Sequence, residues 1–241
     1  MYEKIKSLAK QYYPETVAIR RDLHKYPEQG WLEMRTASLV AKKLEKLGYQ
    51  VLIGKEIMCE EYRMGVPDQE ILESNYQRAI SQGADPYYIK KVKDGFTAVA
   101  GILKNGSGPV VAIRFDMDAL CIEEDDSINH NPGKFGFISC NQGTMHACGH
   151  DGHVAIGLTV AKILSNIKDS IQGTIKLIFQ PAEEGVRGAK SICKSGILKD
   201  VDYIFAGHIW QQEANEDYDI YLGMNETFAT TKLDVIYHGV S

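Results

Sequence analysis

The sequence has no long apolar run and no excess of positive charge. Its first 17 residues lack an apolar segment of the length that a signal peptide needs, and no later run approaches a membrane span. The 27 basic and 32 acidic residues give a net charge of −5, which offers no electrostatic footprint for nucleic acid or an anionic membrane. These absences predict a cytoplasmic protein with no nucleic-acid or membrane partner, and they leave a small-molecule substrate open.

Cysteine is also scarce. The 241 residues contain five, an odd number spread thinly along the chain: Cys59, Cys121, Cys140, Cys148 and Cys193. This distribution argues against a disulfide framework and predicts reduced thiols. A reduced thiol can bind a metal ion.

The apolar residues that are present predict an α/β fold. Continuous aliphatic and β-branched runs alternate with amphipathic segments, which indicates a mixed, mostly parallel sheet with helices on both faces. We expect strands within residues 49–53, 96–103, 108–116, 173–180 and 202–208. We expect helices within residues 15–26, 35–48, 153–167 and 187–196.

Two segments stand apart from this alternation. Residues 56–95 are polar and helical in pattern, with a helix expected from an N-capping Asp68 to a glycine near residue 83, and we interpret them as an insertion on the main fold. Residues 226–241 follow a polar segment and have the pattern of a further strand. We therefore place the end of the first domain at residue 225.

Chemically active side chains follow several of the expected strands. In open α/β sheets the loops at the carboxyl ends of the strands form the ligand crevice. Four segments bring such groups to this rim: Asp116 and Asp118; Glu183 and Glu184; His208; and the stretch "HACGHDGH", residues 146–153, at the start of a helix. Imidazole, thiolate and carboxylate are ligands of zinc and similar ions, so the pattern predicts a divalent-metal site.

Each feature alone has a simpler explanation. An isolated histidine is more often a packed interior residue, and adjacent glutamates are usually a solvated pair. Cys148 also has a competing role as a nucleophile activated by a neighbouring histidine. Glu183 and Glu184 favour the metal hypothesis, because one can bind an ion while the other takes a proton.

Five motifs, in this order and at these separations, resemble the M20 family of metal-dependent peptidases. They are "RRDLHKYPEQGWLE", "RFDMDAL", "HACGHDGH", "IFQPAEEGVRGA" and "AGHIW". They are most similar to its amidohydrolase branch, which holds aminoacylases, auxin-conjugate hydrolases and aminobenzoyl-glutamate hydrolases. The resemblance implies a zinc-peptidase-like catalytic domain, of which residues 1–225 form the N-terminal part, followed from residue 226 by the start of a lid and dimerisation domain.

The resemblance also implies roles for single residues. The family's pattern makes Cys148, His150, Glu184 and His208 ligands of two divalent ions, zinc or manganese. It makes Glu183 the general acid and base. Asp116 and Asp118 then orient the ligands. For His146 and His153, a packing or helix-start role and a direct part in catalysis both remain open.

The implied reaction is hydrolysis of the amide bond in an N-acyl amino acid. The insertion further resembles the aminobenzoyl-glutamate hydrolases, which implies aminobenzoyl-glutamate as substrate; another N-acyl amino acid is the alternative. The family's fold continues beyond a position equivalent to Ser241 and supplies another metal-binding histidine. A catalytically silent fragment or a partner subunit is therefore also possible, and the resemblance implies that the full-length form is a homodimer or a hetero-oligomer with a homologous subunit.

Overall fold

The computed structural model describes residues 1–127, 129–209, 237 and 239. The chain divides after residue 209 into two units, and the first of these, Met1–Ile209, contains the fold described below. The expected domain boundary at residue 225 and the strand expected after it lie outside the described residues.

The five expected strands form one sheet. They are β1 (Gln50–Ile53), β2 (Val99–Asn105), β3 (Val110–Asp116), β4 (Gly173–Gln180) and β5 (Tyr203–Ala206). Their order across the sheet is β1-β2-β4-β3-β5. β1 pairs with β2, and β2 with β4, in antiparallel orientation, whereas β3 is parallel to both of its neighbours, β4 and β5. The mixed α/β sheet is confirmed, with an even division between parallel and antiparallel pairings instead of a parallel majority.

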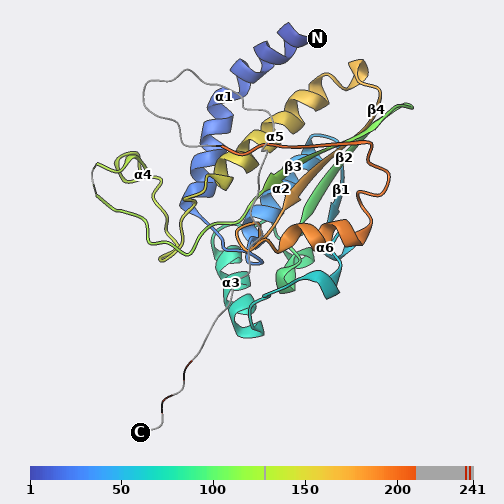
Figure 1. Ribbon diagram of the computed structural model, residues 1–241. Coiled ribbons are helices and arrows are strands. Elements are labelled where there is room, and N and C mark those ends of the chain that lie inside the picture. Colours follow the sequence, from blue (N-terminus) through green and yellow to red (C-terminus); the bar gives the residue numbers. More distant parts are fainter. Residues whose placement is uncertain (128, 210–236, 238, 240–241) are drawn as a thin grey trace. The chain divides into compact units, whose positions relative to one another are not determined.

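Helices cover both faces of this sheet, as predicted (Figure 1). The α-helices are α1 (Tyr2–Lys25), α2 (Met34–Lys46), α3 (Gln69–Ser81), α4 (Asn131–Lys134), α5 (His150–Asn166) and α6 (Gly188–Ser195). α1, α2 and α5 lie on one face and α6 on the other. The described helices include none with the length and apolarity that crossing a membrane requires.

Helix α1 is longer than the sequence predicted. It begins at Tyr2 and continues through Pro14, whereas the expected helix began at residue 15. Proline removes a backbone donor and is usually found in the first turn of a helix, which is why the pattern favoured a start just after it. The extension is mostly exposed, so little apolar periodicity marks it in the sequence.

The alternation of side chains along β4 explains why both faces are covered. Leu177 and Phe179 point to the core beneath α2 and α5, while Ile178 points to the opposite core, where it packs with Trp31 and Ile192 of α6. Successive residues of a strand face opposite sides of the sheet, so an uninterrupted apolar run requires cover on both. Leu177 and Phe179 are 0% exposed, which shows that this cover is complete around them.

The insertion at residues 56–95 is an integral part of these cores. It contains α3 and the 3₁₀ turns η2 (Glu60–Tyr62), η3 (Ile89–Lys91) and η4 (Lys93–Gly95). Another 3₁₀ turn, η1 (Gly54–Glu56), leads into it from β1, and η5 (Lys168–Ser170) follows α5. Leu72 and Val92 join the core beneath α2, and Ile57 joins the core beneath α6. Asp68 is the N-cap residue of α3 as expected, although its side chain makes no capping hydrogen bond.

A buried charged network joins α1 to the first turn of α5. His24 Nδ1 lies 2.8 Å from Asp151 Oδ2, and His24 Nε2 lies 2.8 Å from Glu124 Oε1. Burial disfavours the charged imidazole, but the hydrogen bonds to Asp151 and Glu124 outweigh burial and raise the pKa of His24 above its ordinary 6.5. Burial likewise opposes the two carboxylates, but the hydrogen bonds from His24 keep the pKa of each below its ordinary value of 3.8 or 4.5. Arg20 also contacts Asp151, and His130 contacts Glu124.

This network predicts a pH-dependent contribution to stability. Because the pKa of His24 is raised, its contribution to stability is fully present below pH 6.5 and is lost as the pH rises through the folded-state pKa. Because the pKa values of Glu124 and Asp151 are lowered, their contributions are fully present above pH 4.5 and are lost as the pH falls through the folded-state pKa values. His24→Ala should therefore lower the free energy of unfolding by roughly 3 kcal/mol between these limits, because it removes the buried imidazole that Asp151 and Glu124 share. Urea unfolding of both proteins across pH 3.5–8.5 measures the difference.

The more exposed His130 provides the matched control. His130→Ala removes another imidazole from Glu124 but should have a much smaller effect, because the side chain of His130 is 26% exposed. A difference between wild type and His24→Ala that stayed constant across the pH range would contradict the assigned charges.

Candidate metal centre

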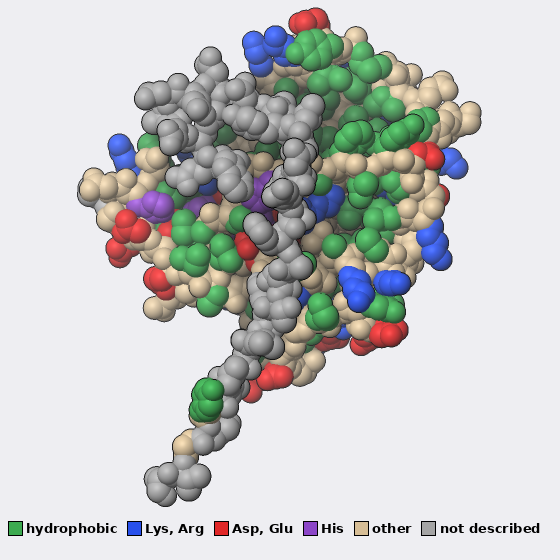
Figure 2. Space-filling view, viewed as in Figure 1, with side chains coloured by type: hydrophobic (Ala, Val, Ile, Leu, Met, Phe, Trp, Pro, Cys, Tyr) green, Lys and Arg blue, Asp and Glu red, His purple; other side chains and the backbone are tan. Residues whose placement is uncertain are grey.

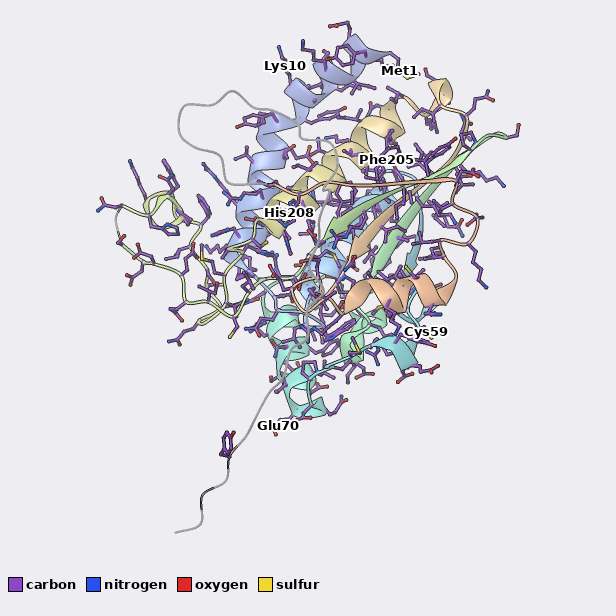
Figure 3. All side chains as sticks on the ribbon, viewed as in Figure 1. Met1, Lys10, Cys59, Glu70, Phe205 and His208 are labelled. Carbon is purple, nitrogen blue, oxygen red and sulfur yellow. The ribbon has the colours of Figure 1, made fainter. Side chains whose placement is uncertain are left out.

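The carboxyl ends of the three mutually parallel strands lie at one edge of the sheet. Asp116 is the last residue of β3, and Asp118 follows it closely. Glu183 follows β4, and His208 lies two residues beyond β5. Helix α5 begins at His150, and the backbone N–H of Ile209 donates to its first-turn residue His153 at 2.8 Å. Figure 3 shows the resulting place of His208, at the end of β5 beside the start of α5.

The structure brings the predicted ligands together in two overlapping groups. One potential ligand atom from each of Cys148, His150 and Glu184 lies within 4.8 Å of the others, and the same holds for Asp116, His150, His153 and His208. Cys148 Sγ is 3.4 Å from His208 Nε2, which connects the two groups. In the space-filling view, histidine side chains are visible near the centre of one face with acidic side chains close by (Figure 2).

Backbone carbonyls orient both candidate imidazoles. His150 Nδ1 donates to the carbonyl oxygen of Asp118 at 2.8 Å, and His208 Nδ1 donates to that of Ile209 at 2.6 Å. A carbonyl oxygen can only accept, so each neutral ring carries its proton on Nδ1 and leaves a lone pair on Nε2. Histidines that bind metals are oriented in this way.

The buried Nε2 of His150 fits a metal ion. His150 is 0% exposed, and its Nε2 has no hydrogen-bond partner among the described residues. The nearest carboxylate oxygens, from Asp116, Glu183 and Glu184, lie 3.7, 3.7 and 3.8 Å away, beyond hydrogen-bonding distance. Atoms that share an ion through bonds of about 2.0–2.3 Å lie roughly 3–4 Å apart, so these separations and this donor set suit a divalent cation.

The charges of the site also favour a cation. Burial, together with the charges of Glu184, Glu183 and Asp116, raises the pKa of the Cys148 thiol to about 12. Burial opposes a charge on His150, but its contact with Asp118 and the charge of Asp116 outweigh burial and raise the pKa of His150 to about 9. The cluster therefore stabilises positive charge and opposes further negative charge.

These shifts also bear on the alternative that Cys148 is a nucleophile. A catalytic cysteine needs a lowered pKa, because the thiolate is the reactive form. A pKa of about 12 keeps this thiol protonated at neutral pH. The electrostatics therefore favour Cys148 as a metal ligand, since metal coordination removes the thiol proton directly.

Asp118 and Asp116 make contacts that orient other groups of the site. The two carboxylate oxygens of Asp118 accept the backbone N–H groups of Glu183 and Glu184 at 2.9 and 3.0 Å. Asp116 pairs with His153 Nδ1 and, through its other oxygen, with the guanidinium of Arg114 at 2.7 Å. Both aspartates are almost completely buried.

The other two histidines of the "HACGHDGH" stretch have different surroundings. His153 Nδ1 pairs with Asp116 and its Nε2 accepts the backbone N–H of Ile209, so both ring nitrogens are engaged. His146 is 4% exposed, neither of its ring nitrogens has a hydrogen-bond partner in the described part of the chain, and burial lowers its pKa to about 4. His146 is thus a buried, neutral side chain that packs in the interior. His153 holds Asp116 in place.

Sequence reasoning missed Glu33, which is 0% exposed and lies beside the site. Its Oε1 accepts the backbone N–H of Ala182 at 2.8 Å, and its Oε2 accepts the hydroxyl of Thr97 at 2.7 Å. Burial and the charge of Asp118 raise the pKa of Glu33 above its ordinary value. Glu33 is the last residue of the "RRDLHKYPEQGWLE" motif, but the motif does not reveal which of its polar residues contacts the site.

The fold and the site together define a class of protein. The chain is an α/β protein whose candidate divalent-metal centre, built from a thiol, imidazoles and carboxylates, lies at the carboxyl ends of parallel strands. The model of the peptidase family M20/M25/M40 matches residues 112–236. The chain belongs to this family.

Curated relatives match nearly all of this chain. It is 44% identical over 240 residues to one of the subunits of p-aminobenzoyl-glutamate hydrolase from Escherichia coli (strain K12), a match that covers 99% of this chain and 55% of the relative. It is 46% identical over 233 residues to indole-3-acetyl-aspartic acid hydrolase of Enterobacter agglomerans, covering 96% of this chain and 53% of the relative. The chain thus spans about half the length of these relatives.

Solved structures agree with the fold. An aminobenzoyl-glutamate utilization protein from Klebsiella pneumoniae matches with a TM-score of 0.73 and 40% identity, covering 86% of this chain and 46% of that protein. A dinuclear metal-binding peptidase of the M20 family from Bacillus subtilis matches with a TM-score of 0.61 and 30% identity, covering 83% and 44%. The zinc-peptidase-like fold expected from the sequence motifs is therefore confirmed.

Proposed function

We propose that this chain forms the N-terminal part of a metal-dependent amidohydrolase that cleaves the amide bond of an N-acyl amino acid. The observation that carries the proposal is that Cys148, Glu184 and His208 converge on His150, with Glu183 beside them. Family membership and the dinuclear metal-binding relative support it.

Four side chains would hold two divalent ions: Cys148, His150, Glu184 and His208. Bound there, the ions supply Lewis acidity, which polarises the amide carbonyl and makes water easier to deprotonate. The thiolate favours zinc and the carboxylates also suit manganese, so we propose zinc or manganese as the cofactor.

Glu183 is the proposed general base and acid. Its side chain is 35% exposed, and its Oε2 lies 3.7 Å from His150 Nε2, so it borders the cluster while facing the solvent-accessible side. Burial and the charge of Asp116 raise the pKa of Glu183 above its ordinary value, which brings it closer to the range useful for proton transfer at neutral pH. Glu183 takes a proton from the attacking water and delivers it to the leaving nitrogen.

Asp116 and Asp118 act in this proposal by orienting other groups. Asp118 holds His150 through its backbone carbonyl and the Glu183–Glu184 pair through its side chain. Asp116 is held by His153 and Arg114 and directs Oδ1 toward His150. Loss of such supporting contacts typically costs metal sites 10–100-fold in affinity or activity, roughly.

The proposed substrate is aminobenzoyl-glutamate. Two of the relatives are named for aminobenzoyl-glutamate, and one, whose identity to this chain is similar to that of the first, is named for indole-3-acetyl-aspartate. Both names describe an aromatic acyl group joined through an amide to an acidic amino acid. Indole-3-acetyl-aspartate is therefore the alternative substrate of first choice.

The test measures hydrolysis and its dependence on metal. Purified chain, stripped with a chelator and reloaded with Zn²⁺ or Mn²⁺, is expected to release p-aminobenzoate from p-aminobenzoyl-glutamate only in the reloaded state. Indole-3-acetyl-aspartate at the same concentration measures the preference between acyl amino acids. Hydrolysis that continued undiminished in the stripped chain would refute a metal-dependent mechanism.

A second candidate function is that of a catalytically silent partner chain. The observation that favours it is the coverage of about half of the relatives' length. In that case the reloaded chain binds metal but releases no p-aminobenzoate until a polypeptide matching the second half of these relatives is added. Two relatives are named as subunits of a hydrolase, which favours assembly of the whole protein with a homologous subunit; a homodimer is the alternative.

A further inference from the structure

The turn that carries Glu183 and Glu184 is held by two buried carboxylates from separate parts of the chain. Three consecutive backbone N–H groups, those of Ala182, Glu183 and Glu184, donate to carboxylate oxygens at 2.8, 2.9 and 3.0 Å. Asp118 accepts the last two, and Glu33, the N-cap residue of α2, accepts the first. Glu33 reaches this turn across 149 residues of sequence.

The conformation of this turn explains why it needs holding. Ala182 has a φ of 51°, in the left-handed region that residues with a side chain rarely adopt. Its carbonyl oxygen accepts the N–H groups of Arg187 and Gly188, which ties the same residue to the start of α6. A non-glycine residue persists in this region when its surroundings determine it, and strained positions of this kind cluster at functional sites.

Glu33 is itself fixed on the side away from the turn. The hydroxyl of Thr97 donates to its Oε2 at 2.7 Å, so both of its oxygens have defined partners. The neighbouring buried Glu28 accepts the N–H groups of Arg35 and Thr36 at 2.9 and 2.8 Å. Glu28 thus accepts the free backbone N–H groups in the first turn of α2. The carboxyl group of Glu33 does not cap this helix and contacts the turn at Ala182 instead.

We infer that Glu33 is a positioning residue, which holds Ala182 in its left-handed conformation and thereby places Glu183 and Glu184 at the metal centre. The inference rests on the proposed function, in which Glu183 transfers the proton and Glu184 binds metal. Glu33 contacts neither the substrate nor an ion in this scheme; it acts through the backbone of Ala182.

Hydrogen exchange of the metal-free chain tests the inference directly. Glu33→Ala should accelerate exchange of the backbone amides of residues 182–184 by about tenfold to a hundredfold, because it removes a hydrogen bond to a buried carboxylate. Glu33→Gln should exchange at close to the wild-type rate, since its amide oxygen can still accept from Ala182 and its NH₂ group can donate to Thr97. Resolved amide exchange by NMR, well below the unfolding temperature, makes the measurement.

Glu28→Ala is the matched control. It also removes a buried glutamate that accepts backbone N–H groups, but its partners Arg35 and Thr36 lie in α2. Exchange should accelerate at those two residues and stay unchanged at residues 182–184. Equal acceleration of residues 182–184 in both alanine variants, or wild-type exchange there in Glu33→Ala, would overturn the inference.

Two further measurements keep the test decisive. If Glu33→Ala does not fold, Glu33→Asp replaces it, because the shorter side chain keeps a carboxyl group but withdraws from Ala182. Unchanged exchange at residues 182–184 then overturns the inference. Titration with Co²⁺ should show affinity at least about tenfold weaker in Glu33→Ala than in wild type or Glu33→Gln. Wild-type chain that bound no Co²⁺ would count against the proposed function, whereas amide exchange would still decide the role of Glu33.

Discussion

Replacing Glu183 with glutamine is expected to lower kcat for hydrolysis of p-aminobenzoyl-glutamate by about 10²–10⁴-fold, the usual contribution of a general base or acid. Metal stoichiometry should stay at the wild-type value. Glutamine retains the size of the side chain and the backbone N–H that donates to Asp118, but its amide cannot accept the proton of the attacking water. Steady-state kinetics and elemental analysis of the same preparation measure both quantities.

The adjacent glutamate is the matched control for this prediction. Glu184→Gln also neutralises one carboxylate, and its backbone N–H likewise donates to Asp118. Because Glu184 belongs to the cluster with Cys148 and His150, its substitution should lower metal affinity first and activity in consequence. Full activity in Glu183→Gln, or metal loss in that variant equal to that in Glu184→Gln, would show that the roles are assigned to the wrong residues.

Replacing Cys148 with alanine is expected to weaken metal binding by about a hundredfold or more, since loss of a direct ligand should exceed the 10–100-fold cost of losing a supporting contact. Cys148 contributes the sulfur of the cluster and lies 3.4 Å from His208 Nε2. With Co²⁺ as the probe, the sulfur-to-metal absorption band of the wild-type protein should disappear in the variant. Cys193→Ala, which removes an exposed thiol on α6, should leave both the band and the affinity unchanged.

Metal binding at Cys148 and His150 should depend on pH, because it releases protons from both side chains. In the metal-free protein the thiol of Cys148, with a pKa of about 12, and the imidazole of His150, with a pKa of about 9, are both protonated at pH 7. A metal ion must displace these protons, so apparent affinity should rise with pH in the neutral range. Cys148→Ala should release one proton fewer per chain in a weakly buffered titration, and equal release by both proteins would exclude the thiol as a ligand.

The strands illustrate how far the sequence alone predicts this fold. Each of the five apolar runs became a strand. Cover on both faces explains β4, whereas β5 is exposed along its whole length and is placed by its pairing with β3. Strand direction was less accessible: β2 is antiparallel to β4 because the short connection at residues 106–109 reverses the chain between β2 and β3, and β4 lies between these two strands, parallel to β3. The extension of α1 before residue 15 was missed, since an exposed helix leaves little apolar periodicity.

The candidate site divides in a similar way. The residue types and their positions after successive strands were readable in the sequence, and the structure brings Cys148, His150, Glu184 and His208 together. The contact between Glu33 and Ala182 was not readable, because no local pattern connects residues 149 positions apart. Which histidine contacts Asp116 was equally hidden, since His146, His150 and His153 share one short stretch.

The sequence by itself determined the strands, most of the helices and the set of groups able to bind a metal, because apolar periodicity and residue chemistry are local properties. Only the tertiary structure decided which of those groups face one another, which ring nitrogens are left for an ion and which carboxylates hold the turn at residues 182–184. Those outcomes depend on burial and on hydrogen bonds between distant segments, and these exist only once β3, β4 and β5 lie side by side.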